Sequence, residues 1–277
     1  MIAVGPAAAQ GNSGSAAGRN KNAKGSAAAA QSGIPASSSA ATPVSTPSTS
    51  ASGVIYYGSW LDDASIVPAG GGWIGLSSGY WKADALRQID APVISAIAGL
   101  HRRVQVGASV PIYHFSDDTG LSETGVGNAA IYGKAQIIDP AASTIGFGLA
   151  VAPLLEISSS AQDRFGWALP LNVELRREGM RFYGSGGYFS RGSVFGSVAA
   201  EVMAGSRTSI TGTFGQSYAS AGSHQSSIGV SLGVFASPTT SFYVGLGRTF
   251  QPVEAGPGGS SIAGGASFML FPPKISP

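Results

Sequence analysis

The segment from Phe165 to Leu175 alternates between two kinds of residue. Its odd-numbered positions are all large and apolar, whereas its even-numbered positions are small or polar and include Asn172 and Glu174. Because neighbouring side chains of a strand point to opposite faces, this pattern predicts a strand between an apolar and a polar phase. The pattern recurs about a dozen times between residues 73 and 271, in segments of ~10 residues that suit tilted membrane-crossing strands. The chain is therefore predicted to be all-β, an antiparallel transmembrane β-barrel of about 12 strands.

Turn signals divide the pattern into an even number of strands. The predicted strands are Trp73–Trp81, Ile89–Leu100, Arg102–Tyr113, Val126–Ile138, Thr144–Ile157, Phe165–Arg176, Met180–Phe189, Ser193–Met203, Thr208–Tyr218, Ser227–Phe235, Ser241–Phe250 and Ser261–Phe271. An even number suits a closed barrel, since lipid cannot satisfy the backbone groups of an open sheet edge. A soluble β-sandwich is the alternative, and the run of long hairpins favours the barrel.

Composition excludes several classes of function. Only 11% of the 277 residues are charged, the net charge is +2 and cysteine is absent. The few charges suit a lipid-facing surface, and the scattered basic residues give no footprint for nucleic acid. The lack of cysteine rules out disulfides, thiolate catalysis and Cys-based metal sites.

The chain divides into four parts. Residues 1–53 form a low-complexity Ala/Ser/Gly/Pro leader, predicted to be disordered and periplasmic, with a possible signal-peptide remnant at residues 1–10. Residues 54–71 contain Tyr56, Tyr57 and Trp60 and are expected to form a lead-in or plug at the barrel mouth. The barrel takes residues 72–271, and residues 272–277 form a tail.

The strand parity also predicts which side chains face the lumen. The large aliphatic residues mark the lipid face, where Arg or Lys at mid-bilayer would cost ~2–4 kcal/mol. The predicted lumen and constriction residues are Arg103, Gln105, Tyr113, Asn128, Tyr132, Lys134, Glu156, Asn172, Glu174 and Glu201. Their charges either brace the interior or form a constriction that selects solutes. Parity turns Arg248 outward.

Catalysis has little support in the sequence. The three histidines lie near predicted strand ends or in a loop, without an HExxH helix or a GxSxG elbow. The pairs Asp62–Asp63 and Asp117–Asp118 are interpreted as turn acids. No catalytic, cofactor-binding or metal-binding residue is therefore predicted, and the chain is not expected to be an enzyme.

The segment Gly125-Val-Gly-Asn-Ala-Ala-Ile-Tyr-Gly-Lys134 resembles the G-x-G-D-x-x-L-x-x-K strand of an outer-membrane channel family named for the meta-pathway of phenol degradation. The Arg-Val-x-x-Gly-x-x-Val-Pro run that ends at Pro111 is similar too, and the likeness covers about residues 72–271. It implies a narrow 12-stranded barrel that passes small, mostly uncharged or hydrophobic molecules. Asn128 stands where that family has an acid.

Together these features predict an outer-membrane, porin-like channel for passive uptake of small neutral or hydrophobic, including aromatic, molecules. Membrane lipids, the small solute and the outer-membrane assembly machinery are the expected partners, with no cofactor and no nucleic acid. Two alternatives remain open, namely a closed structural or adhesive barrel and a rim-active lipid enzyme.

Overall fold

The computed structural model describes residues 59–84, 86–158, 165–190, 192–219, 224–250 and 258–271. Before these it describes only the backbone of five short strands: β1 (Val4–Gly5), β2 (Ser26–Ala27), β3 (Gly33–Ile34), β4 (Ser50–Ala51) and β5 (Val54–Tyr56). Apart from these pieces, the predicted leader, the signal-peptide remnant and the tail after residue 271 lie outside the described residues. The described part includes no helical stretch with the length and apolarity that crossing a membrane as a helix requires.

Fifteen further strands follow the leader. They are β6 (Ser59–Leu61), β7 (Gly72–Ala83), β8 (Leu86–His101), β9 (Val104–Asp117), β10 (Ser122–Val126), β11 (Ala129–Ile138), β12 (Phe147–Val151), β13 (Leu154–Ile157), β14 (Phe165–Arg177), β15 (Met180–Phe189), β16 (Ser193–Met203), β17 (Thr208–Ala219), β18 (His224–Ser237), β19 (Thr240–Phe250) and β20 (Ser260–Phe271). From β7 onward they form one antiparallel sheet of 14 strands. Two spans of the barrel wall are each made by a pair of consecutive strands, namely β10 with β11 and β12 with β13. Counting each pair as one crossing of the wall, the described chain forms a barrel of 12 crossings.

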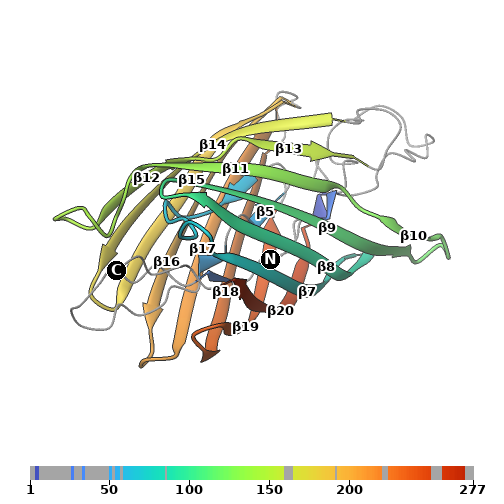
Figure 1. The fold of residues 1–277 in the computed structure, drawn as a ribbon. Helices are drawn as coiled ribbons and strands as arrows, with labels where there is room; N and C mark the ends of the chain where they lie inside the picture. The colour runs from blue at the N-terminus through green and yellow to red at the C-terminus, as the bar shows by residue number, and fades with distance from the viewer. Residues whose placement is uncertain are drawn as a thin grey trace.

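The sheet closes on itself, as predicted. β20 pairs with β7 from Ser260↔Lys82 to Phe271↔Gly72, and β11 pairs on one side with β9 and on the other with β12 and β13. Each crossing therefore has two hydrogen-bonded neighbours, and the strands run obliquely around the barrel (Figure 1). Closure satisfies the backbone groups that lipid cannot.

Two predicted strands are interrupted, and proline explains one of the breaks. Pro153 separates β12 from β13, because proline has no N–H to contribute to a ladder. Pairing continues around it: Gly133 donates its N–H to the Pro153 carbonyl, and Ala152 donates to that of Pro170.

The predicted alternation is confirmed by the exposure of side chains. On β14, Trp167, Leu169 and Leu171 are about half exposed, whereas Asn172 and Glu174 are buried. The apolar residues thus form the outer face of the barrel and the polar residues face inward.

Most connections at one end of the barrel are tight turns. Here β7 begins beside the end of β20, and the connections at residues 102–103, 178–179, 204–207 and 238–239 join neighbouring strands. Gly179, in the predicted Glu178–Gly179 hairpin, has a φ of 67°, which glycine adopts without a Cβ penalty. We call this end the entry end, because the segment that lies inside the lumen joins β7 there.

Candidate functional site in the barrel lumen

Residues 59–71, here called the inner segment, run inside the barrel. Residues 60 to 64 are at most 4% exposed, although two of them are aspartates. The chain returns to the wall at Gly99, where an added Cβ would lie 2.2 Å from the Pro68 carbonyl oxygen. The inner segment therefore packs directly against the backbone of β8.

Lys134 on β11 is the first anchor of the inner segment. Its Nζ lies 2.8 Å from Asp62 Oδ2 and 3.3 Å from Asp63 Oδ1, and it donates a 2.7 Å hydrogen bond to the Ser65 carbonyl. Lys134, Asp62 and Asp63 are all nearly fully buried. Burying such charges is costly unless they are paired, so each side of this contact depends on the other.

Arg181 on β15 is the second anchor. Its guanidinium lies 3.0 Å from Glu174 Oε1 and 3.7 Å from Glu201 Oε2, and it also binds Asp63. Glu174 further pairs with Arg176 at 2.8 Å. Because a guanidinium presents five donors, it can hold several carboxylates at once.

Neutral groups complete the contacts with the inner segment. Gln105 accepts a 2.8 Å hydrogen bond from the Val67 N–H, Gln136 donates to the Ala64 carbonyl at 2.9 Å, and Ser65 Oγ donates to Glu174 at 2.8 Å. These partners come from β9, β11 and β14, so they hold the inner segment along its length.

Aromatic contacts fill the space beside the ion pairs. The rings of Trp60 and Tyr132 pack edge to face with centroids 5.2 Å apart. The Tyr132 ring in turn covers Gly107, where an added Cβ would lie 2.4 Å from it.

Most predicted lumen residues do face inward, and five of them contact the inner segment. These five are Gln105, Tyr132, Lys134, Asn172 and Glu174. Glu201 joins the same network through Arg181.

Three other inward residues, Tyr113, Asn128 and Glu156, make hydrogen bonds with side chains of the barrel wall. Asn128 donates a 3.1 Å hydrogen bond to Glu156, and Tyr113 donates a 2.8 Å hydrogen bond to Glu123.

One expectation from the sequence is wrong and a second is incomplete. Arg103 does not lie on a lumen strand, because β9 begins at Val104, two residues after the predicted start, and Arg103 is exposed in the turn. Asp63 does accept the Ser65 N–H at 3.0 Å, as a turn acid would, but Asp62 and Asp63 also pair with Lys134 and Arg181, which the sequence interpretation missed. Asp117 does cap a turn, by accepting from the N–H groups of Thr119 and Leu121, as interpreted.

Sequence reasoning also missed Arg181, although a signal for it existed. Met180 and Phe182 are apolar and exposed, so the parity of β15 turns Arg181 inward. The sheet register places Arg181 opposite Glu201 on β16.

The wall formed by β17–β20 differs from the wall that holds the inner segment. These four strands contain no Asp, Glu or Lys, and their one Arg, Arg248, is exposed on the outer face as predicted. Their inward positions carry small hydroxyl side chains, namely Ser209, Thr211, Ser217, Ser227, Ser241, Thr249 and Ser267. We call this wall the hydroxyl side, and the wall of β9, β11 and β14–β16 the charged side.

The described residues offer no metal site. No group of three or more His, Cys, Asp or Glu side chains within them is arranged to hold an ion. The carboxylates of the charged side instead face the lysine and arginines described above.

Comparison with known proteins shows the fold. No family model matches the chain, and no curated protein matches it. Among solved structures, the COG4313 outer membrane channel from Pseudomonas putida F1 is similar, with a TM-score of 0.58 and 11% identity over 74% of this chain and 97% of that one. The NanC porin (TM-score 0.55, 8% identity, 71% and 100% covered) and the KdgM porin (0.52, 7%, 70% and 98%) are similar too. The predicted antiparallel β-barrel is thereby confirmed as the fold of the chain.

Proposed function

We propose that the chain is an outer-membrane channel for passive diffusion of small uncharged molecules, aromatic ones included. The carrying observation is the division of the lumen: the aspartates of the inner segment pair with the cations of the charged side, whereas the hydroxyl side carries small neutral side chains. We infer that a solute moves along the hydroxyl side. The outer-membrane location, the lipid contacts and assembly by the outer-membrane machinery belong to the same proposal.

The pairing of the lumen cations supports an uncharged solute. Lys134 and Arg181 both contact carboxylates at short range, so neither offers a free charge to an anion. Small hydroxyls can exchange hydrogen bonds with a neutral polar solute, and inward Phe235 and Tyr243 add apolar surface on the same side. The likeness to a family named for phenol degradation supports the aromatic part of this proposal.

Solute uptake into proteoliposomes tests the proposed selectivity. We expect vesicles that contain the full chain to swell faster in a neutral pentose than in the matching aldonate or amino sugar. Ser227→Arg, which adds a cation to the hydroxyl side, is expected to shift the preference toward the aldonate. Arg103→Gln is the matched control, since Arg103 lies exposed in a turn.

Equal swelling rates in all three solutes, or an unchanged preference in Ser227→Arg, would contradict the proposed path. A second candidate, a closed structural or adhesive barrel, is favoured by one observation: the inner segment is buried inside the lumen. Planar-bilayer recording separates the two, because a closed barrel gives no conductance until residues 54–71 are deleted.

The rim-active lipid enzyme gains no comparable support. Among the described histidines, His114 lies 2.8 Å from Thr124 Oγ1, and His224 stacks on Tyr218. The residues 220–223 that were considered beside His224 lie outside the described residues.

A further inference from the structure

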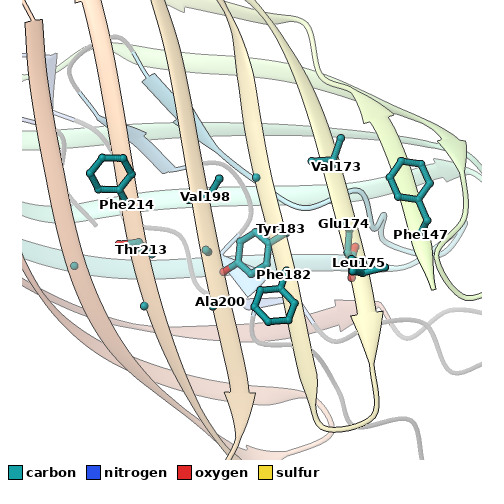
Figure 2. Close-up of a pocket in the computed structure, with 14 residues that line it drawn as sticks. Phe147, Val173, Glu174, Leu175, Phe182, Tyr183, Val198, Ala200, Thr213 and Phe214 are labelled. Carbon is teal, nitrogen blue, oxygen red and sulfur yellow. The ribbon is translucent and has the colours of Figure 1, made fainter. Parts of the chain in front are cut away.

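The outer surface of the barrel carries a hollow over β14–β17. Two adjoining depressions, of about 620 and 660 Å³, share Val173, Gly184, Val198 and Phe214. Val173, Val198 and Phe214 are 40–57% exposed on the lipid-facing side. Figure 2 shows the first depression, with Val198, Phe182 and Phe147 among its lining. We call the two depressions together the outer trough.

Small residues at outward positions form the floor of the outer trough. Gly186 and Gly196 line one depression, and Ala200 and Gly212 line the other. A Cβ added at Gly196 or Gly212 would meet no atom within 4 Å, so both positions open into free space. Phe182 beside them also points outward but is large. The glycine and alanine residues therefore lie lower than their surroundings and leave a hollow in the outer surface.

The lining selects an apolar occupant. The outer trough lies on the face that the strand parity and exposure assign to lipid, and most of its large outward side chains are Leu, Val and Phe. Gln216 and Tyr218 are the polar exceptions, and Tyr218 donates a hydrogen bond to Gln216. An unfilled hollow would lose dispersion contacts with the hydrocarbon around it. A flexible lipid chain can enter such a hollow, whereas water finds few partners there.

A cation stands at the end of the outer trough nearest the entry end. Arg177 follows trough-lining Leu175 by two residues on the same face of β14, about 7 Å along the strand. It is exposed, and its Nη1 donates to the Ile145 carbonyl, which holds the guanidinium at the rim of the barrel. A guanidinium matches a phosphate in charge and in donor geometry.

We propose that the outer trough binds one acyl chain of an anionic phospholipid from the leaflet at the entry end, with Arg177 binding its phosphate. The chain lies over the glycine floor, and the headgroup stays at the membrane surface beside the 178–179 turn.

Native mass spectrometry of the full chain in detergent, titrated with phosphatidylglycerol or phosphatidylcholine, tests this site. We expect the unmodified protein to bind one phosphatidylglycerol at least tenfold more tightly than the double variant Gly196→Leu, Gly212→Leu does. The two new leucine side chains of that variant fill the outer trough. Arg177→Gln is expected to remove the preference for phosphatidylglycerol over phosphatidylcholine while keeping chain binding. The controls are Ala96→Leu, an exposed outward position on β8, and Arg248→Gln, an outward cation on β19.

Each variant is first shown to retain the heat-dependent gel shift of a closed barrel. Equal lipid retention in the double leucine variant and in Ala96→Leu would overturn the proposal. So would an equal effect of Arg177→Gln and Arg248→Gln on headgroup preference. A stable dimer that dissociates only in the double leucine variant would identify a second copy of the chain as the occupant and would also overturn it.

Discussion

The charged side and the hydroxyl side line the lumen of one barrel with opposite kinds of side chain. The charged side places buried ions against an inserted piece of the same chain, so each ion depends on a distant partner. The hydroxyl side uses small neutral side chains, and Thr249 for example exchanges hydrogen bonds with the Gly259 backbone beside it. The comparison teaches that buried charge in a barrel interior needs a specific ionic partner, whereas a small hydroxyl is satisfied by a neighbouring polar group.

The largest expected effect comes from breaking the charged side at Arg181. Arg181→Met leaves Asp63, Glu174 and Glu201 without their shared cation, and removing one partner of a buried ion network typically costs about 3–5 kcal/mol. We expect the free energy of unfolding, measured by urea titration in vesicles, to fall by about that amount. Arg176→Met is the control, because Arg176 is more exposed and its loss leaves Glu174 paired with Arg181. A smaller loss in Arg181→Met than in Arg176→Met would show that the network does not hold the charged side together.

Gly99→Val is expected to lower the free energy of unfolding less than Arg181→Met does, but to displace the inner segment. The new Cβ would lie 2.2 Å from the Pro68 carbonyl, so the inner segment must move away from β8. Because the chain has no cysteine, Ala64→Cys gives a single reporter at a position that is 0% exposed. We expect a water-soluble maleimide to label this cysteine slowly in the native background and faster with Gly99→Val. Gly196→Val, on the outer face, should leave the labelling rate unchanged, and equal labelling in all three proteins would refute the packing argument.

The smallest effect is expected on the hydroxyl side. Ser227→Ala should change the free energy of unfolding by no more than about 0.5 kcal/mol, since small substitutions away from buried networks usually fall in that range. The same urea titration measures it. A loss comparable to that of Arg181→Met would mean that the hydroxyl side is also a structural network, and the contrast between the two sides would disappear.

The fold could be predicted from the sequence because its signal is local. The alternation of single residues predicted the strands of the barrel, which the structure confirms, and also an inward phase for Lys134, Asn172 and Glu174, whose side chains the structure buries. Arg103 was misplaced because the predicted strand begins two residues before β9, which puts a residue of the turn on a lumen-facing strand.

The inner segment could not be placed in the same way. The contact between Asp62 and Lys134 joins residues 72 positions apart, across a sheet whose register no local pattern specifies. Two adjacent aspartates after a short aromatic stretch have the composition of a turn, and only the closed barrel brings cations to them. Arg181 is an intermediate case, since parity turns it inward but does not reveal its three acidic partners.

The pairing of β20 with β7 also bears on the order of assembly. The seam of the barrel joins the first and last of its strands, so its closure requires both ends of the barrel sequence. The inner segment immediately precedes β7 in the chain and therefore does not have to thread into a finished cylinder. We expect the sheet to close around the inner segment, so that Asp62 and Asp63 pair with Lys134 and Arg181 while the barrel forms. The inner segment then serves as the template around which the strands assemble.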